Sequence, residues 1–129
     1  AFRAMALPLA AQLEATTYVR RYPSYNLVAR LPGANSGNGQ VILMGHWDHL
    51  GLCRPEGAAD RICNGAVDNA SGMAVLIEAA GRLAAGPRPS RDILFLATTA
   101  EETGLLGAEY FVTRPTRARA GIAAVINLD

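Results

Sequence analysis

The stretch that decides the fold reads Gly45-His46-Trp47-Asp48-His49-Leu50-Gly51, directly after the run Gln40-Val41-Ile42-Leu43-Met44. Four apolar residues in succession predict a buried strand. His46 and Asp48 follow this strand, and side chains two residues apart on an extended chain face the same side. Histidine is the commonest metal ligand and changes its charge near neutral pH. The stretch therefore indicates either a functional site at a strand end or a plain polar turn.

Length and composition limit the number of domains and the classes of partner. The chain has 129 residues, half of them apolar, which allows one domain at most with enough apolar residues for a core. The formal net charge of +1 gives no sign of nucleic-acid binding. No apolar run approaches the ~20 residues of a membrane span, and no signal-peptide pattern opens the chain, although one removed or encoded further upstream stays open. We therefore expect neither nucleic acid nor a membrane as a partner.

The first part of the chain gives weaker signals. Residues 1–11 cannot be assigned, and residues 12–20 favour a strand by propensity, with a helix as the alternative. Residues 25–31 predict a further strand. The loop over residues 32–39 is rich in Gly, Asn and Pro. It predicts that this strand pairs antiparallel with the strand at 40–45.

A helix is predicted after a long polar loop over residues 50–67, a length typical of functional loops. The segment Asp68-Asn69-Ala70-Ser71-Gly72 opens the helix, with Asp68 as its cap. Gly86-Pro87 ends it. Its apolar stripe at helical spacing comprises Met73, Leu76, Ile77, Ala80, Leu83 and Ala84.

A buried strand at 92–99, a short helix at 104–113 and a last buried strand at 122–128 complete the pattern. Strands and helices that alternate in this way predict an α/β fold with right-handed crossovers. We expect a three-layer α/β/α arrangement with a mixed, largely parallel sheet, in which the first strands form an antiparallel edge.

Six polar residues fall at matching ends of the predicted elements: His46, Asp48, Asp68, Glu101, Glu102 and Asp129. Ligands bind in α/β sheets at the carboxyl ends of the strands. Two like charges 4 Å apart repel by about 4 kcal/mol at an effective dielectric of 20, so protons or cations must neutralise such a cluster. Carboxylates with a histidine suit a catalytic zinc site. Strand-end caps and solvated turns are the alternative, and they explain one such residue better than six.

Four blocks of these residues resemble the co-catalytic di-zinc aminopeptidases of the aminopeptidase Y type, family twenty-eight of the metallopeptidases. The blocks are residues 45–51, 64–72, 99–107 and 126–129, in family order and with family-like spacing over about residues 26–129. The resemblance implies the zinc-exopeptidase (phosphorylase/hydrolase-like) fold, incomplete at its C-terminal side. Residues 1–129 would then be the N-terminal part of one peptidase domain, with 1–24 as a poorly assigned lead-in and 25–129 as the motif-bearing core.

The resemblance also implies a set of zinc ligands. His46 and Asp129 would bind one zinc, Asp68 would bridge two zincs, and Glu102 would bind the second. In the family, the second zinc takes a further histidine from a later segment, which this sequence lacks. We therefore expect two zincs in a complete domain, but at most one tightly bound zinc and little activity in this chain. The unfinished sheet beside the strand at 122–128 would favour self-association.

Catalytic roles follow from the same resemblance. Glu101 would be the general base on a metal-bridging water, and Asp48 would orient His46. The peptide bond between Asp68 and Asn69 would be cis. His49 matches a family position that is not a ligand, which indicates a hydrogen-bonding or rim role.

The implied function is a zinc exopeptidase that acts on peptides with a free N-terminus and is exported to the bacterial periplasm or medium. A single-zinc glutaminyl cyclase or similar acyl transferase is one alternative, and a non-catalytic module of the same fold is another. Secretion would favour a disulfide between Cys53 and Cys63. Two free thiols remain the alternative.

Overall fold

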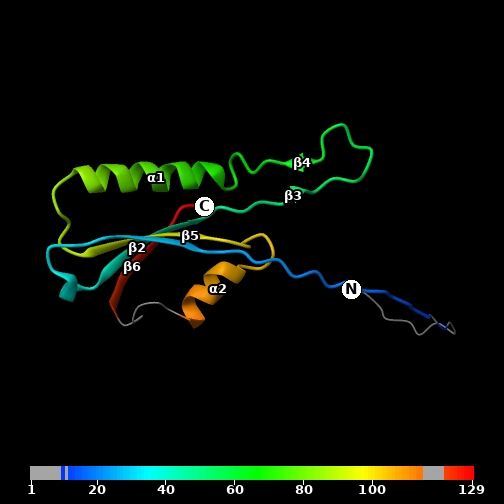
Figure 1. Cartoon of the computed structure of the whole chain (residues 1–129), viewed down its shortest axis with the longest axis horizontal. Helices are drawn as coiled ribbons and strands as arrows, with labels where there is room; N and C mark the ends of the chain where they lie inside the picture. Colours follow the sequence, from blue (N-terminus) through cyan, green and yellow to red (C-terminus); the bar gives the residue numbers. More distant parts are fainter. Residues whose placement is uncertain (1–9, 11, 115–120) are drawn as a thin grey trace, which may run out of the picture.

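The computed structural model describes residue 10, residues 12–114 and residues 121–129. Its centre is a four-stranded sheet in the order β1-β5-β2-β6. Two helices, α1 and α2, lie on opposite sides of this sheet (Figure 1). The α/β class with a mixed sheet is therefore confirmed. The strands are β1 (Leu27–Leu31), β2 (Gln40–His46), β5 (Asp92–Thr98) and β6 (Ile122–Asn127), and the helices are α1 (Ala70–Ala85) and α2 (Leu106–Thr113).

The parallel part of the sheet is formed by β2 between β5 and β6. Apolar side chains that alternate along β2 and β5 fill both faces, because both strands are interior to the sheet. On one face Ile42, Leu94 and Leu96 form the buried core, and Phe111 of α2 packs against it. On the other face Leu76 of α1 is buried. Full burial of each such side chain stabilises the fold by about 1.5–3 kcal/mol.

The predicted antiparallel pairing of the first strand with β2 is wrong. β1 pairs antiparallel with β5, which lies between β1 and β2. The strand β5 is buried along nearly its whole length, so it needs a hydrogen-bonded neighbour on each side. The connection from β1 to β2 contains the 3-10 turn η1 (Ser36–Asn38), and it is long enough to pass the end of β5. The ion pair between Arg30 of β1 and Asp92 of β5, at 2.7 Å, links these two strands.

Two other expectations about strands need correction. Residues 12–20 form neither a strand nor a helix, and they run exposed away from the sheet (Figure 1). Their β-propensity is not used because they have no strand partner. The expected buried strand at 122–128 is β6, but it is mostly exposed. It lies at the sheet edge, where Val125 and Ile126 are about half exposed. Residues 1–9 and 11 of the lead-in lie outside the described residues.

The loop predicted over residues 50–67 contains regular structure. Strands β3 (Gly51–Leu52) and β4 (Ile62–Cys63) pair antiparallel and form an arm beyond the sheet (Figure 1). Cys53, directly after β3, and Cys63 of β4 form a disulfide within this arm. Of the two alternatives left open by the sequence, the structure therefore has the bonded pair.

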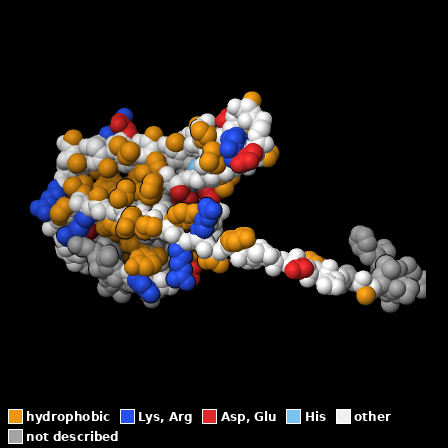
Figure 2. Space-filling view, turned by 45° about the vertical axis from the view of Figure 1, so that its right-hand side comes forward, with side chains coloured by type: hydrophobic (Ala, Val, Ile, Leu, Met, Phe, Trp, Pro, Cys, Tyr) orange, Lys and Arg blue, Asp and Glu red, His pale blue; other side chains and the backbone are white. Residues whose placement is uncertain are grey.

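The helix α1 carries the predicted stripe, but only part of it is covered. Leu76 is buried, whereas Ile77 is 68% exposed and lies at an apolar groove shared with Leu27 and Val28 of β1. Figure 2 shows a broad gathering of hydrophobic side chains on one face of the molecule. Among the described residues no helix has both the length and the apolar character that a membrane span requires.

Candidate metal centre

The candidate site lies at the carboxyl ends of the parallel strands. β2 ends in His46, β5 is followed by Glu101 and Glu102, and Asp129 follows β6. Asp68 comes just before α1. Parallel strands present their carboxyl ends at one edge of the sheet. The topology therefore gathers residues from four separate parts of the chain.

His46, Asp68 and Asp129 form the tighter group. His46 Nε2 lies 3.0 Å from Asp68 Oδ1 and 3.2 Å from Asp129 Oδ1. Zinc ligands about 2.0–2.2 Å from the ion stand ~3.3 Å apart in a tetrahedral site. The donor atoms and their spacing therefore fit one zinc ion. His46 is buried, whereas both carboxylates are exposed, so the group is open to solvent.

The surroundings of the His46 ring suit metal binding. Its Nδ1 lies 3.0 Å from the backbone carbonyl oxygen of Asp48. If Nδ1 carries the proton and donates it there, the Nε2 lone pair faces the two carboxylates. The Asp48 side chain was expected to orient His46, but its carboxylate is 3.7 Å from Nδ1, and the closer contact of Nδ1 is to the Asp48 main chain. An outer hydrogen bond of this kind fixes the ligand's ring orientation.

The carboxylate of Asp48 has another contact. Its Oδ1 accepts a hydrogen bond from the backbone N–H of Glu101 at 3.1 Å. This bond holds the turn after β5 against the end of β2. The side chain of Glu101 brings Oε2 to 4.0 Å from His46 Nε2. Glu101 is thus beside the candidate metal-binding group without being part of it.

The surrounding charges change the pKa of His46. Burial by itself lowers the pKa, but the hydrogen bond to Asp48 and the charges of Glu101, Asp129 and Asp48 outweigh it, so the pKa is raised above its usual value. A raised pKa means that the neighbourhood attracts a positive charge. A metal cation bound at the same place would meet the same negative field.

His49, Asp68 and Glu102 form a second group whose ligand atoms lie within 4.8 Å of one another. His49 Nδ1 is 2.5 Å from Glu102 Oε1. Asp68 belongs to both groups, so it lies where a bridging carboxylate would have to be. The position of Asp68 is set by the turn before α1, where the Asp68–Asn69 peptide bond is cis.

A comparison with known protein families identifies the family of the chain. The model of peptidase family M28 matches residues 26–129, which is most of the chain. The chain belongs to peptidase family M28.

Three curated proteins illustrate what the chain is similar to. A probable zinc metalloprotease of Pyrenophora tritici-repentis is 38% identical over 103 residues, which cover 80% of this chain and 23% of the relative. Leupeptin-inactivating enzyme 1 of Streptomyces exfoliatus is 34% identical over 109 residues, or 81% and 22%. The probable lipoprotein aminopeptidase LpqL of Mycobacterium tuberculosis is 32% identical over 124 residues, or 95% and 22%. The chain therefore spans less than a quarter of the length of these relatives.

The side chain of Asn69 lies next to the candidate site, where it bonds to the Leu128 carbonyl and to the start of α1. The expectation that Asp68 caps the helix is wrong, because Asn69 is the cap and its Oδ1 accepts from the Gly72 N–H at 3.0 Å. Asn is as good a cap as Asp, so the signal was present one residue later. Asp68 is thereby left free of the cap and able to face His46.

Proposed function

We propose that this chain provides the metal-binding and proton-transfer residues of a zinc-dependent exopeptidase that removes N-terminal residues from peptides. The observation that supports it best is the approach of Asp68 and Asp129 to Nε2 of His46, with Glu101 beside them. Two of the relatives named above are called a zinc metalloprotease and an aminopeptidase. Because the chain spans only part of those proteins, its substrate remains a proposal.

His46, Asp68 and Asp129 would hold one zinc ion, and Asp68 with Glu102 would hold a second. Bound zinc supplies a Lewis acid for the scissile carbonyl and lowers the pKa of bound water towards ~7. Three protein ligands are usual for a catalytic zinc. The first position should therefore bind zinc more tightly than the second.

Glu101 is the residue proposed to move the proton. The hydrogen bond from its backbone to Asp48 fixes the turn, and its Oε2 stands near the three ligands without joining them. A carboxylate so placed can take a proton from the attacking water and give it to the leaving amine. Such acid–base transfer contributes typically 10²–10⁴ in rate.

Export of the protein from the cell is part of the same proposal. The Cys53–Cys63 disulfide supports it, because disulfides persist mainly outside reducing compartments. The name of the mycobacterial relative, a lipoprotein aminopeptidase, is consistent with a place outside the cytoplasm.

The deciding experiment replaces Glu101 with Gln in the longest form of the protein that contains this chain. We expect the hydrolysis of aminoacyl anilides to fall by about 10²–10⁴, while zinc content measured by elemental analysis stays the same. Glu109→Gln, on the exposed side of α2, is the matched control and should keep full activity. Unchanged turnover in Glu101→Gln would refute the base assignment. Cyclisation of an N-terminal Gln peptide without release of amino acids would point to an acyl transferase.

A further inference from the structure

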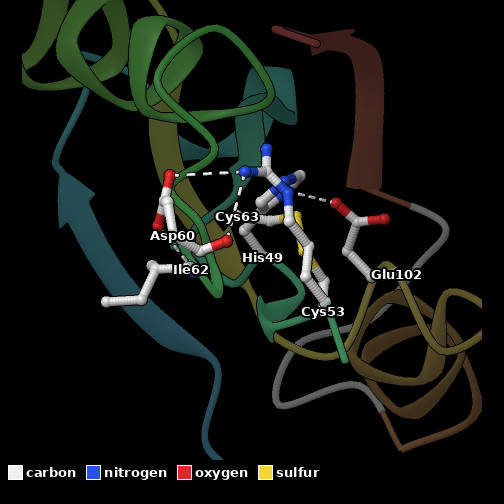
Figure 3. The surroundings of a disulfide bond; sticks show 7 residues. His49, Cys53, Asp60, Ile62, Cys63 and Glu102 are labelled. Atoms are coloured by element: carbon white, nitrogen blue, oxygen red, sulfur yellow. Dashed lines mark hydrogen bonds and ion pairs between the residues drawn. A yellow bond between two sulfur atoms is a disulfide. The ribbon is translucent and has the colours of Figure 1, made fainter. Parts of the chain in front are cut away.

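His49 and Glu102 make a contact that the proposed chemistry does not use. His49 Nδ1 lies 2.5 Å from Glu102 Oε1. Both atoms are buried, and within the described part of the chain neither makes a hydrogen bond of good geometry, to the other or to any further group. Figure 3 shows the two side chains facing each other next to the Cys53–Cys63 disulfide. A buried polar atom without a partner is costly, so these two atoms have each other as their natural partners.

The His49 ring packs against the backbone of Gly65. A Cβ at Gly65 would lie 2.6 Å from Cγ and 2.7 Å from Cβ of His49. The His49 side chain therefore occupies the space that a side chain at position 65 would need. Gly65 also has a φ of 64°, a conformation that favours glycine. A side chain larger than that of glycine at position 65 would therefore collide with His49.

Two roles fit a histidine at this place: it could bind a metal with Asp68 and Glu102, or it could hold Glu102. The distance between His49 Nδ1 and Glu102 Oε1 distinguishes the two roles. Two atoms bound to one tetrahedral zinc at about 2.0–2.1 Å stand ~3.3 Å apart, whereas Nδ1 and Oε1 are 2.5 Å apart. There is no room for an ion between these two atoms, but there is room for a proton.

We propose that His49 is a positioning residue, which donates Nδ1–H to Oε1 of Glu102 and leaves the other carboxylate oxygen to face a metal ion beside Asp68. This inference rests on the proposed zinc function. Hydrogen-bonded partners of ligands typically change metal affinity 10–100-fold when they are removed. His49 would thus strengthen the weaker of the two metal positions without binding the metal itself.

The first test observes the proton directly. The chain has two histidines, so a long-range ¹⁵N–¹H NMR spectrum of the full chain labelled with ¹⁵N-histidine contains four ring nitrogens, and His49→Asn assigns them. We expect Nδ1 of His49 to be protonated with and without zinc, and Glu102→Ala to remove that preference. An unprotonated Nδ1 in the zinc-free chain, or a zinc-bound Nδ1 after titration, would overturn the proposal.

The second test measures its consequence by calorimetric titration with zinc. His49→Ala should weaken the second zinc by 10–100-fold and leave the first unchanged. His49→Asn, which keeps a donor near the position of Nδ1, should restore most of the affinity. Leu50→Ala, an exposed neighbour, is the control for local disturbance. Equal losses in the Ala and Asn variants would overturn the proposal. Failure of the chain to bind any zinc would refute the zinc function, whereas the NMR result would still decide the His49–Glu102 bond.

Discussion

The side-chain amide of Asn69 donates a hydrogen bond to the backbone carbonyl of Leu128 at 2.7 Å. The same side chain caps α1 through the N–H of Gly72, so it ties the start of the helix to the end of β6. Asp68 and Asp129 are the residues next to this contact in the sequence. Their approach to His46 therefore depends on a residue that is not itself proposed as a metal ligand.

Replacing Asn69 should separate its two roles. Asn69→Ala removes the cap, which costs about 1 kcal/mol, and leaves the Leu128 carbonyl unpaired, which costs about 1–3 kcal/mol more. Asn69→Ser keeps a capping oxygen but is too short to reach Leu128. We expect urea denaturation to show the larger loss of stability in Asn69→Ala. Zinc titration should show weakened binding in both variants, and wild-type zinc affinity in Asn69→Ser would contradict the role of the Leu128 contact.

Two glycines in α1 should respond in opposite directions to the same substitution. A Cβ at Gly72 would lie 2.2 Å from Asn69 Oδ1 and 2.4 Å from the Leu128 oxygen, whereas a Cβ at Gly81 would meet nothing within 4 Å. Gly72→Ala should therefore destabilise the fold by about 1–3 kcal/mol through crowding. Gly81→Ala should stabilise it by about 1 kcal/mol through helix propensity. Equal effects in thermal denaturation would show that the contact between α1 and β6 is not close.

Acid should weaken the link between β1 and β5. The pKa of Asp92 is held below its usual value by the hydrogen bond from the Gly33 N–H and by that from Arg30, which together outweigh its burial. A lowered pKa stabilises the fold above the unfolded-state value of about 3.9, and the stabilisation is lost as pH falls through the lower folded-state value.

The measurement compares the free energy of unfolding of wild type and Asp92→Asn between about pH 2 and 6. We expect the wild type to be more stable at the upper end, with the difference shrinking towards the lower end. Asp60→Asn, on the exposed arm, serves as the control for a lost carboxylate. A difference that stays constant over this range would exclude Asp92 as the source.

The disulfide should stabilise the arm that contains β3 and β4. Cys53 and Cys63 are ten residues apart, and closing a loop of that size contributes roughly 2–3 kcal/mol in the chain-entropy model. We expect the Cys53→Ser/Cys63→Ser double variant to lose that amount in urea denaturation. Reductant should destabilise the wild type alone, since the double variant has no bond to break. Two free thiols in the denatured, unreduced wild type would contradict the bond.

Local patterns in the sequence determined much of this protein. The apolar runs of β2 and β5 and the capped stripe of α1 indicate their structures because burial and capping act over a few residues. The positions of His46, Glu101 and Asp129 at strand ends follow from the same patterns, since parallel strands end at one edge.

Only the tertiary structure decided which strands pair and which side chains touch. β5 lies between β1 and β2 because a strand buried along nearly its whole length needs two neighbours, a condition that no local signal expresses. The Asn69–Leu128 bond and the His49–Glu102 contact join residues that are distant in the sequence. Their partners are set by the packing of separate elements, and each segment by itself would form neither contact.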